Sequence, residues 1–379
     1  MPDQQSSLRR KTICFLVDSL GIGGRENVLI DAIKCLSKDY DITIAALYGV
    51  SSELQVRVKD KAIIRANLLG QYYRLQDLIL LSIPLLGPYL FRHYVPGTYD
   101  YLIIMHPAHL MAAYTKIGTK KICWSHTDKD VIWEKLSKLN VLQRIKKYRL
   151  KQCYKKTDET WVVTDSIRDA MRRAFDLSNI YTLDNPIDCQ KIAAEATDFE
   201  PTEMNPEFFH FVMVGRLSYE KGHIRALRAF KNLKTDIPCK LVIVGDGQER
   251  KALETYVKNN RMEDRVIFTG YQSNPYPYIR CANAMIQPSI IESFGLTMLE
   301  AMILGTPVVT TDTIGGIRVT NRGKYGVLVE NTEEGIFHGM EKVLCVESIA
   351  AESCENPYRW ALNFDLPQFQ QQLYQLLEQ

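Results

Sequence analysis

Two glutamates, Glu292 and Glu300, have the side chains and the spacing to hold the two ends of an extended ligand. A helical pattern opens between them at Gly295 and ends near Gly305. Eight positions along a helix span about 12 Å, roughly the separation between the ribose and the sugar ring of a nucleotide diphosphate sugar. The carboxylates would bind hydroxyls, and the N–H groups of Gly295 and Leu296 would hold the phosphates. Alternatively, Glu292 is an ordinary helix-terminal charge and Glu300 a solvated side chain, although its apolar neighbours favour a partnered carboxylate.

Two cations, Arg216 and Lys221, follow a strand pattern at residues 208–214. Arginine offers a planar fork and lysine a point charge, and together they suit a diphosphate leaving group. As solvated surface cations they would have no such role. Their types and positions leave both interpretations open.

A glycine-rich turn, which includes Gly23 and Gly24, follows the first predicted strand and runs into a helix. Glycine lets the backbone approach a ligand closely, and a helix start favours an anion. The pattern lacks the full dinucleotide fingerprint, which argues against a nicotinamide-dependent dehydrogenase. A simple tight turn is the alternative. The sequence contains no P-loop motif and no metal-ligand spacing, so neither an ATPase nor a metal site is predicted.

Two histidines, His106 and His126, each come directly after a predicted strand. Either could bind a substrate hydroxyl or accept a proton. A histidine at a strand end is also often only hydrogen-bonded locally. His126 is the stronger candidate.

Alternating strands and helices must position these groups, and this alternation predicts an α/β protein with parallel sheets covered by helices. Ligands of such doubly wound sheets bind beyond the carboxyl ends of the strands. We expect an N-terminal domain at residues 1–190, a linker at 191–207, a second domain at 208–355 and a C-terminal helix at 356–379 that crosses back to the first domain. The predicted strands lie at 12–17, 41–47, 101–105, 121–124, 159–163, 208–214, 240–244, 266–268, 284–287, 307–310 and 326–329.

Composition limits the class of protein. A chain of 379 residues with 46% apolar and 24% charged residues is typical of a soluble globular protein with two domains. The net charge of +3 is too small to indicate nucleic-acid binding. Nine cysteines without a Cys-x2-Cys pair, and a start without a signal-peptide pattern, predict buried thiols in the cytoplasm.

Two segments could contact a membrane. The run from Lys135 to Lys156 holds nine Lys or Arg residues, no acidic residue and interleaved leucines, which favours peripheral docking on the inner membrane face. A solvated helix face is the alternative. The apolar stretch at residues 78–91 is too short and too broken by prolines to span a bilayer. It would form either an interfacial surface or a buried helix pair.

Several motifs of the second half, taken together, resemble glycosyltransferase family 4, or glycosyl transferases group 1, of the bacterial surface-polysaccharide type. The resemblance is strong over residues 208–335 and looser at Gly23-Gly24-Arg-Glu, Trp124-Ser-His and Asn185-Pro-Ile-Asp. The strongly matching motifs are Gly215-Arg-Leu-Ser-Tyr-Glu-Lys-Gly, Val244-Gly-Asp-Gly, Phe268-Thr-Gly-Tyr, Glu292-Ser-Phe-Gly-Leu-Thr-Met-Leu-Glu-Ala-Met and Gly305-Thr-Pro-Val-Val.

The resemblance implies a GT-B fold, with two Rossmann-like doubly wound domains facing across a cleft. It also implies retaining, metal-independent transfer from a nucleotide sugar without a cofactor. The residues implied to be catalytic are His126, Arg216, Lys221 and Glu292. Those implied to bind the donor are Gly23, Gly24, Arg216, Lys221, Tyr271, Gln272, Glu292, Ser293, Phe294, Gly295, Leu296 and Glu300.

Each implied residue has a role in that scheme. Arg216 and Lys221 would stabilise charge on the departing diphosphate. Glu300 would bind the ribose, and Glu292 with the backbone of 293–296 the donor sugar and phosphate. Tyr271 and Gln272 would lie near the base, His126 would contact the sugar, and Gly23 and Gly24 would approach the phosphate or the acceptor.

The expected reaction is same-face attack assisted by the departing phosphate. The two-carboxylate scheme of retaining hydrolases needs a nucleophile about 5 Å from an acid, and Glu292 and Glu300 are expected to lie too far apart for it. Arg25 stands where the family commonly has a small residue, which suggests an anionic or lipid-phosphate acceptor.

The expected function is therefore transfer of a hexose-type sugar, preferably from a UDP-sugar, to a hydroxyl of a glycan or lipid-linked oligosaccharide in surface polysaccharide biosynthesis. Nucleic acid is not an expected partner. A nucleotide-sugar epimerase of GT-B-like architecture is one alternative, and a non-catalytic nucleotide-sugar binding subunit is another.

Overall fold

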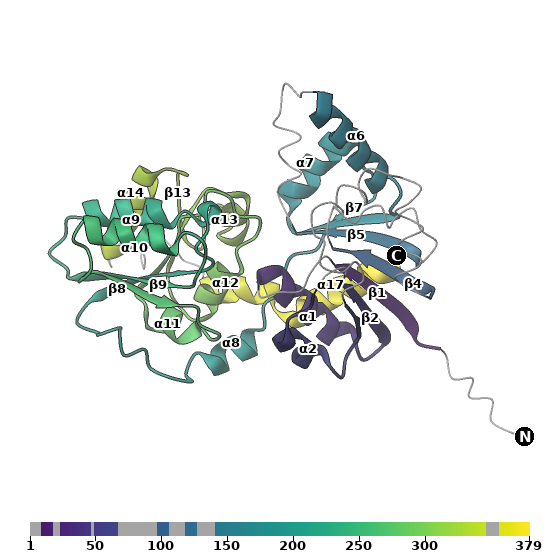
Figure 1. The fold of residues 1–379 in the computed structure, drawn as a ribbon, viewed down its shortest axis with the longest axis horizontal. Coiled ribbons are helices and arrows are strands. Elements are labelled where there is room, and N and C mark those ends of the chain that lie inside the picture. The colour runs from purple at the N-terminus through teal and green to yellow at the C-terminus, as the bar shows by residue number, and fades with distance from the viewer. Residues whose placement is uncertain are drawn as a thin grey trace, which may run out of the picture. The chain divides into compact units, whose positions relative to one another are not determined.

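The computed structural model describes residues 9–17, 23–46, 49–66, 97–105, 118–126, 141–345 and 356–379. The chain forms two compact units, the first comprising Met1–Asp184 with Phe369–Gln379 and the second Asn185–Gln368. Each unit contains one parallel sheet with helices packed on it (Figure 1). Residues 18–22, His106, the stretch 78–91 and residues 135–140 lie outside the described part of the chain.

The sheet of the first unit has seven strands in the order β3-β2-β1-β4-β5-β6-β7. Its order reverses direction between β1 and β4, as in a doubly wound fold. The strands are β1 (Lys11–Val17), β2 (Tyr40–Ala46), β3 (Ile63–Arg65), β4 (Tyr99–Ile104), β5 (Gly118–Ser125), β6 (Glu159–Val162) and β7 (Ile180–Thr182), and the helices are α1 (Gly24–Leu36), α2 (Ser52–Val58), α6 (Val141–Tyr154) and α7 (Asp165–Phe175).

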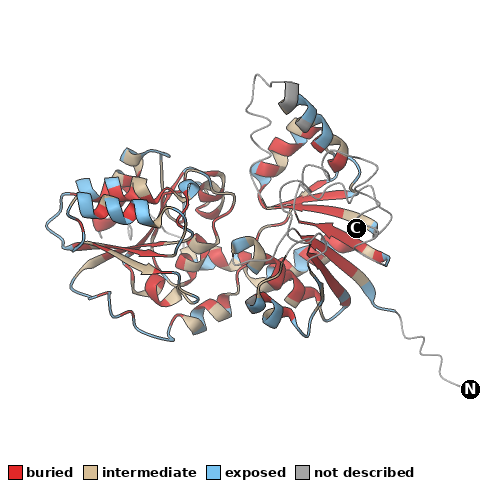
Figure 2. Ribbon diagram, viewed as in Figure 1, coloured by how far each residue is buried: buried red, intermediate tan, exposed pale blue. Residues whose placement is uncertain are grey.

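The central strands of this sheet begin with polar or charged residues but are largely apolar and buried toward their carboxyl ends, because helices cover both faces of a doubly wound sheet. Residues 13–17 of β1 are all buried, and Figure 2 shows the strands in red. The two edge strands, β3 and β7, were not predicted. Each has three residues, and the β3 side chains Ile63 and Arg65 are exposed, so neither strand has the apolar run that marks the others.

The sheet of the second unit has six strands in the order β10-β9-β8-β11-β12-β13, and its order reverses between β8 and β11. The strands are β8 (Phe209–Val214), β9 (Cys239–Val244), β10 (Val266–Gly270), β11 (Ala284–Gln287), β12 (Val308–Thr311) and β13 (Val327–Val329). The helices are α8 (Cys189–Glu195), η3 (Tyr219–Lys221), α9 (His223–Asn232), α10 (Arg250–Asn259), α11 (Tyr276–Cys281), α12 (Leu296–Ile303), α13 (Ile314–Val319), α14 (Glu333–Leu344), α16 (Pro357–Ala361) and η4 (Leu362–Phe364).

The segment expected to be a linker, residues 191–207, lies inside the second unit. It begins within α8, and side-chain hydrogen bonds hold the residues after α8 against α11. Arg280 donates from Nε to the Ala196 carbonyl at 2.8 Å and also pairs with Glu200. The acidic, proline-containing composition therefore marks a packed connection, because an arginine from a distant helix satisfies its polar groups.

The last helix, α17 (Leu366–Glu378), contributes its residues from Phe369 onward to the first unit. The Tyr101 hydroxyl donates to the Leu377 carbonyl at 3.0 Å, and the Phe369 ring stacks on Trp124 with centroids 6.2 Å apart. Of the C-terminal elements expected to cross back, α16 and η4 belong to the second unit, and only the part of α17 from Phe369 onward belongs to the first. Within the described residues, we find no helix with both the length and the apolarity required to cross a bilayer.

Candidate functional site

The candidate site lies at the carboxyl edge of the second sheet, where the strand order reverses. Arg216 and Lys221 follow β8, and Glu292 follows β11. Because β8 and β11 are parallel neighbours, the loops after them emerge at the same edge. This is the place where doubly wound sheets bind ligands.

Lys221 and Glu292 are in direct contact across this switch point. Lys221 Nζ lies 2.6 Å from Glu292 Oε2, and the two side chains are 29% and 11% exposed. A hydrogen bond between two charged groups is shorter and stronger than one between neutral groups. The structure thus brings together two of the residues predicted to be catalytic, and Lys221 is not an isolated surface cation.

The backbone around Gly222 creates this contact. Gly222 has a φ of 68°, and a Cβ atom there would lie 2.2 Å from the Pro288 carbonyl oxygen. Glycine is therefore required where the start of α9 meets the loop after β11. The Ile290 N–H also donates to the Glu220 carbonyl at 2.8 Å. These contacts hold the Lys221 and Glu292 loops against each other.

Arg225 and Asn331 form a second set of hydrogen bonds to the loop after β11. Arg225 Nη1 donates to Asn331 Oδ1 at 2.6 Å and to the Pro288 carbonyl at 3.3 Å, and Asn331 Nδ2 donates to the Ile290 carbonyl at 3.0 Å. Both side chains therefore position the backbone that leads to Glu292. They were not predicted, because 106 residues separate them in the sequence and neither stands in a recognised motif.

His223 starts α9 close to Lys221, and it is buried. Burial, with a smaller contribution from the Lys221 charge, lowers the pKa of His223 to about 4. The imidazole is therefore neutral at pH 7 and adds no positive charge to the site.

The turn from Ser293 to Leu296 leads into α12 with Gly295 as its N-cap, and no side chain caps this helix. Gly295 has a φ of 91°, which favours glycine, and its added Cβ would lie 2.1 Å from Met298 Cε. The Phe294 ring is buried and packs edge-on against Phe364 with centroids 5.7 Å apart. Phe294 thus anchors the turn in the core, so any ligand contact from it would come from its backbone.

Glu300 lies in the middle of α12, and its carboxyl makes no hydrogen bond with the described residues. Part of its surface reaches solvent, yet protein atoms surround the carboxyl closely enough that burial raises its pKa to about 7, and the nearby Lys191 lowers it in part. The expectation of a partnered carboxylate is thus not met by a protein group. The carboxyl is available to a ligand hydroxyl, for which it could act as donor or acceptor.

Arg216 is exposed, and its guanidinium makes no hydrogen bond or ion pair with the described residues. It follows Gly215, whose carbonyl oxygen would lie 1.9 Å from a Cβ at Gly245. The ends of β8 and β9 are therefore packed through glycine backbone. Arg216 shares the sheet edge with Lys221 but does not join the Lys221–Glu292 pair.

Tyr271 and Gln272 follow β10 at the same carboxyl edge, two strands away from β8. Tyr271 is 52% exposed. Gln272 Nε2 donates to the Thr269 carbonyl at 3.1 Å, which fixes its side-chain amide close to the strand end. The pair therefore lies at the outer part of the edge, beyond Arg216.

The first unit positions Gly23, Gly24 and His126 at the carboxyl edge of its own sheet. Gly23 is the N-cap of α1, which starts at Gly24, and no side chain caps this helix. His126 follows β5, and its ring lies 4.6 Å from the Trp124 ring. The neighbouring Arg25 pairs with Glu26 at 3.0 Å.

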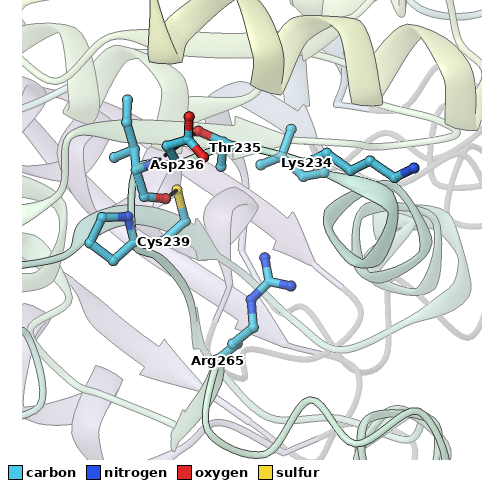
Figure 3. A pocket seen from close by; sticks show the side chains of 8 residues that line it. Lys234, Thr235, Asp236, Cys239 and Arg265 are labelled. Atoms are coloured by element: carbon cyan, nitrogen blue, oxygen red, sulfur yellow. Dashed lines mark hydrogen bonds between the residues drawn. The ribbon is translucent and has the colours of Figure 1, made fainter.

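A surface pocket of the second unit lies away from this site. Its lining comes from the loop before β9 and from Arg265, just before β10, and Figure 3 shows Lys234 extending away from Asp236. These residues mark the amino ends of the strands, whereas Arg216 and Glu292 follow the carboxyl ends. We therefore do not assign the pocket to the candidate site.

Comparison with known proteins identifies the second unit. Residues 195–358 match the model of the family described as glycosyl transferases group 1. Residues 195–358 belong to that family. This confirms the resemblance on which the site residues of the second unit were chosen, since the matched segment contains Arg216, Lys221, Glu292 and Glu300.

Two curated relatives of this group 1 segment are bacterial. The N-acetylgalactosamine-N,N'-diacetylbacillosaminyl-diphospho-undecaprenol 4-alpha-N-acetylgalactosaminyltransferase of Campylobacter jejuni is 32% identical over 162 residues, which cover 42% of this chain and 43% of the relative. The lipopolysaccharide 1,6-galactosyltransferase of Salmonella typhimurium is 28% identical over 173 residues, covering 44% and 46%. The alignments thus span less than half of each relative.

Solved structures show the fold of the whole chain. The Anabaena protein HepE, in complex with UDP-glucose, aligns over 97% of this chain and 99% of its own with a TM-score of 0.74 and 17% identity. The predicted GT-B fold, α/β with two doubly wound sheets, is confirmed by this likeness and by the two parallel sheets.

The group 1 segment also contains a site residue that was not predicted. Gln287, at the end of β11, was read only as part of a buried strand, yet its amide donates to Glu292 Oε2 at 2.9 Å. The signal was present, because an amide at the end of an apolar strand needs a partner. Within the described residues, no three His, Cys, Asp or Glu side chains come close enough together to hold a metal ion.

Proposed function

We propose that this chain is a retaining glycosyltransferase that moves a hexose-type sugar from a nucleotide diphosphate sugar, with a UDP-sugar favoured, to a hydroxyl of a glycan or lipid-linked acceptor. The observation that supports this most is the Lys221–Glu292 contact, which lies at the switch point of a group 1 segment. A cation paired with a carboxylate at that edge could exchange its partner for a diphosphate while the carboxylate turns to a sugar hydroxyl.

The cations supply the main catalytic effect in this proposal. Breaking the glycosidic bond leaves negative charge on the nucleoside diphosphate, and Lys221 and Arg216 would stabilise it as it develops. Arg216 has no protein partner among the described residues, so its guanidinium could bind phosphate oxygens as a planar fork. With two cations in this role, the scheme needs no metal ion.

The carboxylates and the α12 turn would orient the donor. Glu300 would bind the ribose, Glu292 a sugar hydroxyl, and the uncapped backbone at Gly295 and Leu296 a phosphate. Tyr271 and Gln272 would lie beside the base, and His126 would contact the sugar from the first unit. Attack would come from the same face that the diphosphate leaves, with a phosphate oxygen taking the acceptor proton.

The names of the relatives favour a bacterial surface glycan as the product. One acts, by its name, on a diphospho-undecaprenol acceptor and another on lipopolysaccharide. We therefore propose an acceptor carried by a lipid and a reaction in the cytoplasm at the inner membrane face. The eight cysteines of the described chain are free thiols, as expected in a reducing compartment.

Helix α6 would provide the membrane contact. Its Ile145 and Tyr148 side chains are 46% and 64% exposed, and the arginines at positions 144 and 149 beside them are exposed too. Exposed apolar and basic side chains on one helix favour an anionic lipid surface.

Release of free nucleoside diphosphate tests the proposal. A panel of UDP-, GDP- and ADP-sugars is incubated with membrane extract and with the wild type, Lys221→Ala, Glu300→Ala or the control Lys251→Ala, which changes an exposed lysine on α10. We expect release from one donor, dependent on the extract and lost in the two site variants only. A changed nucleotide sugar formed without an acceptor would instead indicate an epimerase. Binding without turnover of any donor would indicate a non-catalytic subunit.

A further inference from the structure

Gln287 is a buried amide whose hydrogen bonds all point toward the candidate site. It ends β11 and is 3% exposed. Its Nε2 atom donates to Glu292 Oε2 at 2.9 Å and to Ser289 Oγ at 3.1 Å. Its Oε1 atom accepts from Thr297 Oγ1, on the first turn of α12, at 3.5 Å. One side chain thus links the strand, the loop after it and the helix.

Glu292 Oε2 receives three donors at once. Lys221 Nζ lies at 2.6 Å and Gln287 Nε2 at 2.9 Å, and the Ser289 hydroxyl completes the set at 3.4 Å. The second carboxylate oxygen, Oε1, makes no hydrogen bond with the described residues. Glu292 is therefore fixed through one oxygen and open at the other.

The Lys221–Glu292 pair presents a physical difficulty for ligand binding. Lys221 must leave or share Glu292 if it is to bind a diphosphate. Glu292 is only 11% exposed, and a poorly solvated carboxylate that loses its cation is destabilised unless other donors remain. Gln287 and Ser289 are the donors that can remain, because both belong to the strand and loop that carry Glu292.

We propose that Gln287 is a positioning residue that lets Lys221 change partners. In the free protein its amide holds Glu292 in place to pair with Lys221. When the donor binds, Lys221 moves to the diphosphate, Gln287 keeps its bond to Glu292 Oε2, and Oε1 accepts a hydroxyl of the donor sugar. This inference rests on the proposed glycosyltransferase function. It involves no bond making or breaking, only an exchange of hydrogen-bond partners.

The proposal separates two effects of changing Gln287. Binding of a nucleoside diphosphate alone uses Lys221 and not the sugar, so it should depend little on the amide. Turnover of the intact donor needs Glu292 in its correct position, so it should depend on the amide strongly. A residue that only supports the sheet would lower both together, through loss of folded protein.

The first test replaces Gln287 by methionine, which has similar length and no N–H donor. The control is Thr306→Val, because Thr306 is also buried on this unit and its hydroxyl donates a single hydrogen bond, to the Ile279 carbonyl at 2.7 Å, away from Glu292. The probes are UDP binding by calorimetry and the kcat and KM for the donor found in the release panel. We expect Gln287→Met to lower kcat about 10- to 100-fold and to leave the UDP Kd within roughly threefold. A kcat equal to that of Thr306→Val, or a UDP affinity that falls as much as kcat, would overturn the proposal.

A second test uses the pH profile of Gln287→Glu. The introduced carboxyl lies beside Glu292, and two adjacent carboxylates share a proton at acidic pH. The protonated form can donate to Glu292 as the amide does, whereas the ionised form repels it. We expect activity to be recovered relative to wild type as the pH falls from about 8 to about 6. An unchanged ratio to wild type across that range would contradict the positioning role.

A third readout is independent of any activity. In a crystal structure of ligand-free Gln287→Met, we expect the Glu292 carboxylate to rotate and its contact with Lys221 to lengthen. An unchanged 2.6 Å contact would refute the role of Gln287 even if the chain proves to be a glycosyltransferase. Conversely, a displaced carboxylate in a chain that turns over no donor would support the role of Gln287 and refute the proposed function.

Discussion

The carboxyl edges of the two sheets differ in their glycine residues. In the second unit, β8, β9 and β10 end at or directly before Gly215, Gly245 and Gly270, all with positive φ. In the described part of the first unit, the one glycine with positive φ is Gly97, at the amino end of β4. The second edge thus packs its strand ends closely through glycine backbone, since a Cβ at Gly245 would lie 1.9 Å from the Gly215 carbonyl oxygen.

The charged side chains at the two carboxyl edges also differ. The second edge carries Arg216 without a protein partner among the described residues, and Lys221 held by Glu292. The first edge carries His126 beside Trp124, and Arg25, which is paired with Glu26. Its exposed Arg65 ends the edge strand β3, two strands away from β1. In the second unit, by contrast, Arg216 and Lys221 both follow β8, directly at the point where the strand order reverses. We therefore propose that the anionic part of the donor binds to the second unit.

The largest expected effect tests the difference in charge between the two edges. Lys221→Met should lower kcat/KM for the donor about 100- to 1000-fold, because one preorganised group opposite a developing charge contributes this much. His126→Ala should lower it only about tenfold, as expected for one hydrogen bond to a neutral hydroxyl. Steady-state release of nucleoside diphosphate measures both.

Binding of UDP, measured by calorimetry, provides the control for that pair of variants. It should weaken in Lys221→Met and stay unchanged in His126→Ala. Equal losses of UDP affinity in both variants would contradict the proposal that UDP binding depends on the second edge.

The next largest effect tests the role of the glycine backbone in the second unit. Gly222→Ala should lower the free energy of unfolding by roughly 2 to 3 kcal/mol, because its Cβ would lie 2.2 Å from the Pro288 carbonyl oxygen and its φ is 68°. Gly305 has a similar φ of 77°, and nothing lies within 4 Å of a Cβ added there. Gly305→Ala should therefore lower the free energy of unfolding by only about 1 kcal/mol. Denaturant unfolding compares the two variants.

Activity separates these glycine variants further. In the folded protein, Gly222→Ala should also lose turnover, because it displaces the loop that leads to Glu292. Gly305→Ala should retain it. Equal turnover of the two folded variants would instead show that the left-handed backbone at Gly222 matters only for folding.

The two units also show which features could be predicted from the sequence and which could not. The candidate site residues of the second unit could be predicted because they stand in short motifs, each a continuous stretch of sequence. Gln287 was missed because its role depends on a loop turning back on its own strand, and Arg225 because its partner Asn331 lies on another element. Edge strands β3 and β7 were missed because their three residues include a polar or charged one, whereas the equally short β13 consists of Val327, Leu328 and Val329 and was predicted from that apolar run. Local patterns predicted the elements, whereas contacts between distant elements required coordinates.

A smaller effect is expected on the acceptor side. The double variant Arg144→Gln, Arg149→Gln on α6 should bind anionic vesicles about 10- to 30-fold more weakly, at roughly 1 kcal/mol per basic residue near the surface. The control is Lys151→Gln with Lys155→Gln, which removes the same number of charges from the carboxyl end of the helix and the residue after it, where both lysines pair with Asp176 at 3.4 and 3.1 Å. Sedimentation with vesicles containing phosphatidylglycerol measures the difference. Equal binding by wild type and both double variants would exclude α6 as the contact.

The smallest expected effect concerns the unusual acid of the second edge, Glu300. Burial raises its pKa to about 7 in the folded protein, above the value in the unfolded chain. The folded state therefore holds an extra proton between about pH 4.5 and 7, and the stabilisation from this proton is lost as the pH rises through 7. Glu300→Gln imitates the neutral form at every pH. It should thus gain stability relative to wild type on going from pH 5 to pH 8.5, by roughly 1 to 2 kcal/mol after allowance for its partial exposure.

Melting temperatures at the two pH values measure this gain, and Glu254→Gln is the control because Glu254 is exposed and paired with Arg250. The reverse sign, with Glu300→Gln losing stability at high pH, would mean that the carboxylate is stabilised in the fold by a cation. In that case Glu300 would be a structural ion-pair partner. The expected sign instead describes a carboxyl kept in an unfavourable environment without a hydrogen-bond partner among the described residues, which is consistent with a group that has its partner only when a ligand hydroxyl is bound.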